Sequence, residues 1–104
     1  MGGVKHDSNK SRVDLISPIA LEDLGMVLKH GAAKYGEHNW REGLAWSRLI
    51  GAALRHLLAF MRGEDIDPES ELPHVSHAMC NLMMLSEFGR TRKELDDRYR
   101  YGEK

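Results

Sequence analysis

Apolar residues recur at helical spacing in three segments of this 104-residue chain, and no segment shows the alternation of a β-strand. This pattern limits the fold more than any other feature of the sequence. Ser17 and Pro18 form a typical helix start, and Gly36 is a typical helix end. We therefore expect an all-α fold, a small bundle whose main helices span residues 18–35, 47–62 and 73–88.

The length of the chain fits a single domain that covers residues 1–104. We expect its core over residues 5–88, beginning with an extended N-terminal arm. The strongly charged residues 89–104 are expected to form a solvated or disordered tail. Because a bundle of this size buries a modest core, we also expect the protein to form oligomers.

The overall charge and the cysteine content exclude several classes of protein. A formal net charge of −1 gives the chain no general attraction to nucleic acid or to an acidic membrane. No apolar run is long enough to cross a bilayer, and the N-terminus shows no signal-peptide pattern. Cys80 is the only cysteine, which excludes an internal disulfide. These features predict a cytoplasmic protein that binds neither nucleic acid nor membrane.

Possible metal ligands and proton carriers are most concentrated between Arg55 and Asn81. This stretch contains the histidines His56, His74 and His77 and the acidic residues Glu64, Asp65, Asp67, Glu69 and Glu71. Two helices joined by a short loop pack most simply as antiparallel neighbours. That pairing places His56 opposite His77 and the acidic loop beside His74. Either these groups bind a metal and move protons, or they form a structural hydrogen-bond network.

A second polar cluster lies where the first predicted helix gives way to a loop. Lys34, Asn39 and Trp40 could contact a phosphate, the edge of a base and its face. Alternatively, Lys34 interacts with the negative end of the helix and Trp40 fills the edge of the core. Lys10 and Arg12, in the N-terminal arm, could also reach phosphate oxygens.

Five short motifs between residues 5 and 88 form a distinctive set. They are Lys5-x-Asp7-x-x-Lys10-x-Arg12-x-Asp14-Leu15, Pro18-x-Ala20-Leu21, Gly31-Ala32-x-Lys34-Tyr35-Gly36-x-x-Asn39-Trp40, Leu54-Arg55-His56 and Arg62-Gly63-Glu64-x-x-Asp67-Pro68-Glu69-Ser70-x-Leu72-Pro73-His74-x-x-His77-Ala78. Together they resemble the N-terminal domain of phage dATP/dGTP diphosphohydrolases, relatives of the MazG-like nucleotide pyrophosphatases. The resemblance implies an all-α domain that cleaves a (deoxy)nucleoside triphosphate to the monophosphate and pyrophosphate. It also implies Mg or Mn as cofactor and a homodimer or homotetramer.

The chain departs from the metal-binding pattern of MazG-like enzymes. It has no EExxE motif, and Glu94-x-x-Asp97 matches their ExxD motif by spacing alone. A metal would instead have to be bound by residues of the central stretch, namely His56, Glu64, Asp67, His74 and His77.

The resulting hypothesis is a metal-dependent hydrolase that acts on a purine (deoxy)nucleoside triphosphate in the cytoplasm of a host cell. Its catalytic residues would be His56, Glu64, Asp67 and His77. Its substrate-binding residues would be Lys10, Arg12, Lys34, Tyr35, Asn39, Trp40 and Arg55. The alternative hypothesis is a non-catalytic protein that binds and sequesters a nucleotide, and the third is a small helical interaction module.

Overall fold

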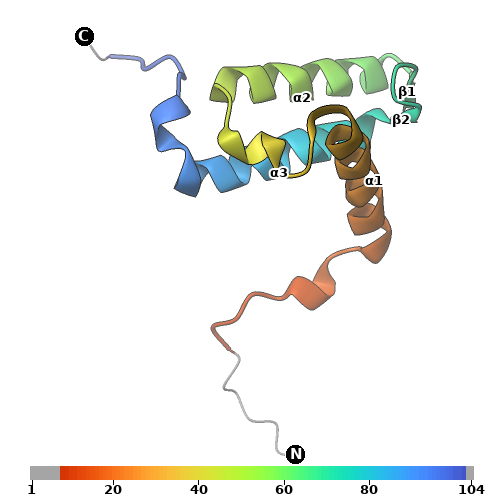
Figure 1. Ribbon diagram of the computed structural model, residues 1–104, viewed down its shortest axis with the longest axis horizontal. Helices are drawn as coiled ribbons and strands as arrows, with labels where there is room; N and C mark the ends of the chain where they lie inside the picture. The colour runs from red at the N-terminus through yellow and green to blue at the C-terminus, as the bar shows by residue number, and fades with distance from the viewer. Residues whose placement is uncertain (1–7, 103–104) are drawn as a thin grey trace, which may run out of the picture.

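The computed structural model describes residues 8–102, and its fold is almost entirely helical (Figure 1). In chain order, with η for a short 3-10 helix, the elements are η1 (Val13–Leu15), α1 (Pro18–Tyr35), η2 (Asn39–Glu42), α2 (Trp46–Met61), β1 (Ile66–Asp67), β2 (Leu72–Pro73), α3 (His74–Thr91) and η3 (Lys93–Leu95). The predicted all-α bundle of three main helices is therefore confirmed. The first helix has the predicted bounds, and α2 and α3 begin within one residue of the predicted starts.

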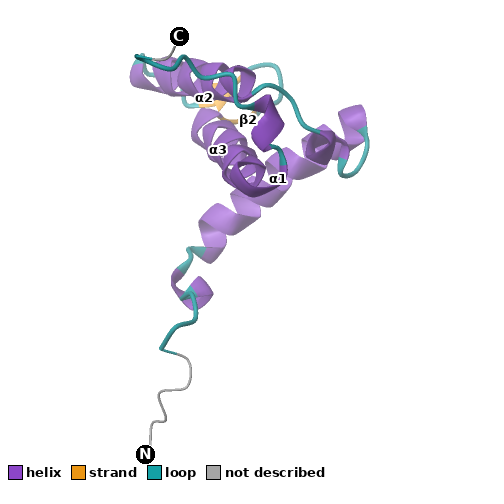
Figure 2. Cartoon of the chain, turned by 90° about the vertical axis from the view of Figure 1, so that its left-hand side faces the viewer, coloured by secondary structure: helices purple, strands orange, loops and turns teal. Residues whose placement is uncertain are grey.

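The helices are arranged as an antiparallel pair crossed by a third helix. α2 and α3 run side by side, and α1 packs across α3 at a steep angle (Figures 1 and 2). The N-terminal arm leads away from the α2–α3 pair, and its described residues, 8–17, are exposed (Figure 1). Lys5 and Asp7, which belong to the first motif, lie outside the described residues. Within residues 8–102, no helix is both long and apolar enough to cross a membrane.

A small apolar core lies at one end of the α2–α3 pair, where the start of α2 meets the end of α3. Trp46 at the start of α2, Leu49 one turn later and Phe88 near the end of α3 are buried against one another. Phe88 is fully buried, and burying an aromatic side chain of this size stabilises the fold by roughly 1.5–3 kcal/mol. Trp40 of η2 packs on the same cluster. The core therefore fixes the loop between α1 and α2 against the far end of α3.

Residues 89–98 pack back on the bundle and do not form the solvated tail expected from their charge, whereas residues 99–102 are exposed. α3 continues to Thr91, and Leu95 of η3 contacts the apolar core. The indole N–H of Trp46 donates to the carbonyl of Arg92 at 3.1 Å. Ala45 holds the N-cap position of α2, and Ser47 lies in its first turn. The hydroxyl and the backbone N–H of Ser47 both donate to the carboxylate of Asp97, and these two hydrogen bonds lower the pKa of Asp97.

A two-stranded hairpin joins α2 to α3, where the sequence predicted a short acidic loop. Ile66 pairs with Pro73 and Asp67 with Leu72 in antiparallel register. Each strand has two residues, too short for the alternating pattern that identifies strands in a sequence. The backbone N–H of His74 donates to the carbonyl of Asp65 at 2.9 Å. The hairpin therefore fixes the first turn of α3 beside the acidic loop.

Candidate functional site

An open cleft of about 970 Å³ lies between α1, the η2 loop and the α2–α3 pair. Its apolar wall includes Val27 of α1 and Met84 of α3. Polar side chains come from the end of α1, from the hairpin and from the facing surfaces of α2 and α3. Small-molecule sites are concave, largely apolar and roughly 300–1,000 Å³ in volume, with a few polar groups that converge on the ligand. The cleft fits that description.

Two stacked imidazoles form part of the polar wall. The rings of His56 on α2 and His77 on α3 lie 4.6 Å apart, measured between centroids, with an interplanar angle of 8°. The antiparallel pairing of α2 and α3 therefore brings these residues together as predicted. His30 of α1 adds a third ring, edge-on to His77 at 6.5 Å. All three histidines line the cleft.

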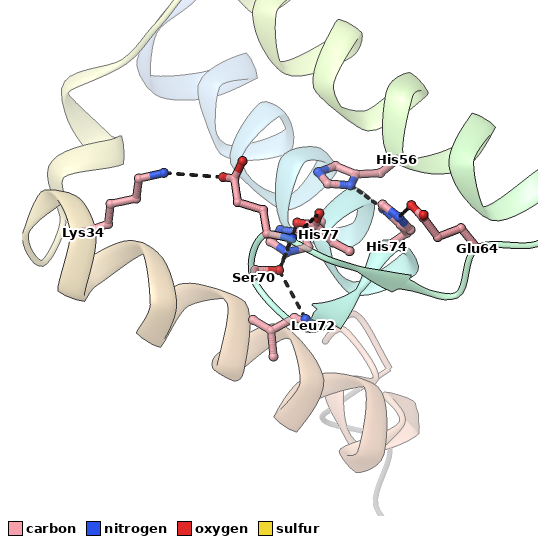
Figure 3. Close-up of polar contacts among 9 residues, drawn as sticks. Lys34, His56, Glu64, Ser70, Leu72, His74 and His77 are labelled. Carbon is pink, nitrogen blue, oxygen red and sulfur yellow. Dashed lines mark hydrogen bonds and ion pairs between the residues drawn. The ribbon is translucent and has the colours of Figure 1, made fainter.

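Ser70 links His77 to the hairpin through a complete set of hydrogen bonds (Figure 3). Its hydroxyl oxygen lies 3.0 Å from Oδ2 of Asp67 and 2.6 Å from Nε2 of His77, and it accepts the backbone N–H of Leu72 at 3.2 Å. A hydroxyl has one proton to donate, and an ionised carboxylate can only accept a hydrogen bond. Ser70 therefore donates to Asp67, and the Nε2–H of His77 donates to Ser70.

The pKa values of the cleft residues agree with this assignment. Burial raises the pKa of Asp67, but the hydrogen bonds from the Glu69 N–H and the Ser70 hydroxyl, together with the nearby histidines, outweigh it and leave the pKa below its usual value. Burial also lowers the pKa of His56, and the neighbouring His77 and His74 lower it further. Burial is the largest cause that lowers the pKa of His77, against the opposing charge of Asp67. Near neutral pH the cleft therefore contains an ionised Asp67 beside two neutral imidazoles.

His74 lies behind the stacked pair and is almost fully buried, at 5% exposure. Its Nδ1 lies 2.9 Å from Nδ1 of His56, and its Nε2 lies 2.7 Å from Oε1 of Glu64 (Figure 3). Both ring nitrogens of His74 thus have partners within the protein. Neither His74 nor Glu64 lines the cleft.

Cationic and aromatic side chains stand at the end of the cleft formed by α1 and η2. The ammonium group of Lys34 lies 3.7 Å from Glu69 across the cleft (Figure 3). The guanidinium group of Arg41 lies 4.5 Å from the centroid of the Trp40 ring, and its Nη1 donates to both carboxylate oxygens of Glu87, at 3.1 and 2.9 Å. Trp40 also packs on Phe88, with ring centroids 6.0 Å apart. This end of the cleft therefore offers a positive charge and a supported aromatic surface.

Asn81 lies one helical turn beyond His77 and also lines the cleft. Its side-chain oxygen is buried and has no hydrogen-bond partner among the described residues. An unpaired buried polar atom of this kind costs on the order of 1–3 kcal/mol. The amide oxygen and nitrogen exchange places by a half-turn of the side chain, so Asn81 can offer either an acceptor or a donor to a ligand.

The structure divides the predicted site residues into two groups. Those that line the cleft are Lys34, Tyr35, Asn39, Trp40, His56, Asp67 and His77. Those that do not are Lys10, Arg12, Arg55, Glu64 and His74. Arg12 forms an exposed bidentate pair with Asp14 in the arm, and Arg55 is exposed on α2, with its guanidinium group over its own preceding turn.

Several cleft residues were not named among the catalytic, metal-binding or substrate-binding residues, although Glu69 and Asn81 belong to the stretch singled out for possible ligands. They are His30, Arg41, Glu69, Ser70 and Asn81. The spacing of Ser70 three residues after Asp67 is a usable signal, because Asp side chains commonly bind the loop residues that follow them. Asn81 also carried a signal, since it follows His77 by four residues on the same helix face. His30 and Arg41 carried none, because their partners are distant in sequence.

The donors in the cleft suit a magnesium ion that arrives with a phosphate ligand better than a preformed metal centre. Among residues 8–102, no group of three or more His, Cys, Asp or Glu side chains is placed to hold a metal ion by itself. Magnesium in nucleotide enzymes is usually held by one or two carboxylates together with substrate phosphates and water. Asp67 and Glu69 supply carboxylates at the cleft wall, and their oxygen chemistry matches that requirement.

Fold and cleft together define a small all-α protein whose ligand-sized cleft carries clustered imidazoles, carboxylates and an aromatic surface. Residues 2–98 match the family described as "dATP/dGTP diphosphohydrolase, N-terminal", and the chain belongs to this family. A relative from Salmonella phage PMBT28, named dATP/dGTP diphosphohydrolase, is 39% identical over 98 residues. The match covers 94% of this chain but 33% of the relative, so the chain corresponds to only part of that protein. No solved structure matches the chain.

Proposed function

We propose that this chain hydrolyses a purine deoxynucleoside triphosphate to the monophosphate and pyrophosphate, with the substrate in the cleft. The observation that carries the proposal is the composition of the cleft. It combines the stacked pair His56 and His77 with the ionised Asp67, and it faces Lys34 across the opening. Membership of the diphosphohydrolase family and the name of the phage relative support the choice of reaction.

The two ends of the cleft suit the two ends of a nucleotide. Trp40, supported by Arg41 and Phe88, offers a face on which a purine can stack. Lys34 would exchange its long, exposed contact with Glu69 for a phosphate oxygen. Asn39 and Asn81 line the same cleft and offer hydrogen bonds to the base or sugar. The triphosphate would then extend from Lys34 toward the histidines.

Magnesium or manganese would be held by the carboxylates of Asp67 and Glu69 together with the phosphates. When bound, the ion polarises a phosphate and offsets the charge that develops on it. The protein residues have separate tasks. Ser70 and Leu72 fix the position of Asp67 and His77, and the lowered pKa of Asp67 keeps its carboxylate ionised. His56 remains neutral and can accept a proton from water.

Product analysis with purified protein tests the proposal. The chain is incubated with a panel of purine and pyrimidine nucleoside triphosphates, with and without Mg or Mn, and both free products and protein-bound nucleotide are identified. Monophosphate plus pyrophosphate from a purine substrate is expected. We expect His77→Ala to abolish turnover with unchanged helical content, and Arg55→Ala, outside the cleft, to serve as a matched control.

The same experiment examines sequestration without cleavage, which the name of the phage relative does not favour. Intact nucleotide bound stoichiometrically, with no product at any metal concentration, would refute hydrolysis by this chain.

We also propose that a second copy of the chain covers the outer surface of α2. Leu54, Leu58 and Met61 recur at helical spacing on this surface and are 53%, 48% and 79% exposed. Exposed apolar stripes of this kind mark interaction surfaces. A self-complementary contact is the commonest arrangement in soluble homo-oligomers, and the net charge of −1 produces little repulsion between copies.

A further inference from the structure

A continuous row of hydrogen bonds connects an exposed carboxylate to the wall of the cleft. Glu64 Oε1 lies 2.7 Å from His74 Nε2, and His74 Nδ1 lies 2.9 Å from His56 Nδ1 (Figure 3). The Glu64 side chain is 53% exposed and that of His74 is 6% exposed. His56 lines the cleft, and its second ring nitrogen, Nε2, points away from His74 (Figure 3).

The positions of the protons in this row follow from the chemistry of its ends. An ionised carboxylate can only accept a hydrogen bond, so His74 Nε2 must carry a proton to donate to Glu64. In neutral His74 the other nitrogen, Nδ1, is then an acceptor. The contact between the two Nδ1 atoms needs one donor, which must be His56 Nδ1–H. Neutral His56 is therefore left with an unprotonated Nε2.

We propose that Glu64 and His74 are positioning residues that hold His56 as its Nδ1–H tautomer, so that Nε2 faces the cleft as the proton acceptor for the attacking water. The role as proton acceptor rests on the proposed hydrolysis, whereas the tautomer does not. A histidine side chain free in water prefers the opposite tautomer, with the proton on Nε2. The buried His74 thus couples the carboxylate of Glu64, at the surface, to the tautomer of His56 in the cleft.

Two further observations support a fixed and neutral His56. The ring stacks on His77 at 4.6 Å and 8°, which limits its rotation about the bond to Cβ. Burial and the adjacent histidines lower the pKa of His56, so the imidazole is free of a second proton at neutral pH. A base in this state requires no prior deprotonation.

In the proposed step the water oxygen forms a bond to phosphorus and its proton passes to Nε2 of His56. The bond from phosphorus to the leaving phosphate oxygen breaks, and its electron pair stays with that oxygen. His56 is then an imidazolium whose Nδ1–H still donates to His74. Glu64 stabilises the positive charge through His74, in the way that a carboxylate supports a catalytic histidine.

The tautomer can be measured directly by nitrogen NMR of the imidazole groups in the full chain labelled with ¹⁵N. The spectrum is recorded above neutral pH with a chelator present, and the His56 signals are assigned by their loss in His56→Asn. The expected spectrum shows a protonated Nδ1 and an unprotonated Nε2 for His56. A His56 that is mainly protonated on Nε2 would overturn the proposal.

Variants of Glu64 and His74 test whether these two residues determine the tautomer of His56. Glu64→Ala removes an exposed side chain and should shift His56 toward the Nε2–H tautomer. Asp65→Ala is the matched control, because this neighbouring carboxylate makes no side-chain hydrogen bond among the described residues and is exposed. His74→Asn, whose amide can still accept from His56 Nδ1, should preserve the tautomer that His74→Ala loses. An unchanged His56 spectrum in Glu64→Ala would refute the role of Glu64.

Kinetic measurements distinguish the positioning role of Glu64 from the proposed hydrolysis. Glu64→Ala should lower kcat by about 10–100-fold, the range found when the hydrogen-bond partner of a metal-binding histidine is removed. KM should stay nearly unchanged, and Asp65→Ala should match the unaltered chain. If the spectra agree but no nucleotide is cleaved, the tautomer stands and the hydrolysis fails. If nucleotide is cleaved while Glu64→Ala keeps full kcat, the positioning role fails and the hydrolysis stands.

Discussion

His56 and His77 stack as two nearly parallel imidazoles, 4.6 Å apart, across the α2–α3 interface. Because two positive charges at that distance repel each other, the stack is compatible with at most one protonated ring. Asp67 lies 3.5 Å from His77 and partly offsets a charge there. The folded protein therefore accommodates at most one charged ring in this pair, and the proposed chemistry starts from a neutral His56.

Lowering the pH should reduce the free energy of unfolding, because His56 and His77 resist protonation in the folded protein. Burial and neighbouring histidines hold the pKa values of His56 and His77 below the usual 6.5, although Asp67 opposes the shift. When the pH falls below 6.5, the unfolded chain binds protons that the folded chain resists, so the free energy of unfolding decreases until the folded pKa values are passed. Urea unfolding across this pH range, with a chelator present, measures the effect. The decrease should be smaller in His56→Gln, and an equal decrease in that variant would contradict the explanation.

The sequence was sufficient to place His56 opposite His77, because helical spacing and a short connection determine which faces of α2 and α3 meet. It was not sufficient to identify Ser70 as the bridge between His77 and Asp67, since that contact depends on a hairpin too short to have a sequence pattern. The all-α fold and the family were likewise predicted correctly.

Contacts between distant parts of the chain explain the remaining differences. Charge alone suggested a solvated C-terminal segment, but Asp97 binds the start of α2, fifty residues away in the chain. Leu95 is the apolar residue that attaches this segment to the core. A single apolar residue among charges gives no periodic signal. The same is true of the ion pair between Arg41 and Glu87, which supports the aromatic end of the cleft.

Gly43 should be required for the docking of the C-terminal segment. Its φ angle is +96°, and an added Cβ would lie 2.5 Å from Cδ1 of Leu95. Gly36 has a similar φ of +99° but open space around it, so Gly36→Ala isolates the backbone strain. We expect Gly43→Ala to reduce the free energy of unfolding by about 1–3 kcal/mol more than Gly36→Ala, the usual cost of overpacking. Urea unfolding provides the measurement, and equal effects of the two changes would show that Leu95 does not pack as described.

The exposed stripe on α2 predicts that the chain is a dimer or tetramer in solution. Light scattering coupled to gel filtration measures the mass directly. Leu58→Glu, at the centre of the stripe, should shift the protein toward monomer because it places a charge in an apolar contact. Arg48→Glu is the control, as it alters an exposed charge on another face of the same helix. A chain that is monomeric at all concentrations would refute the proposed contact between copies.

Asn81 should affect stability and nucleotide binding in opposite directions. Its buried oxygen lacks a partner within residues 8–102, so Asn81→Leu, which has a similar shape, should raise the free energy of unfolding by about 1 kcal/mol. The same change removes a hydrogen bond to the nucleotide and leaves a ligand group unpaired, which should weaken binding about tenfold. Urea unfolding measures the first effect, and calorimetric titration with a non-hydrolysable purine nucleotide measures the second.

Met84→Leu is the matched control, because it alters an apolar cleft residue without a polar group and should change neither quantity greatly. Loss of stability in Asn81→Leu would mean that the amide has a structural partner, and unchanged affinity would place the nucleotide away from this wall of the cleft.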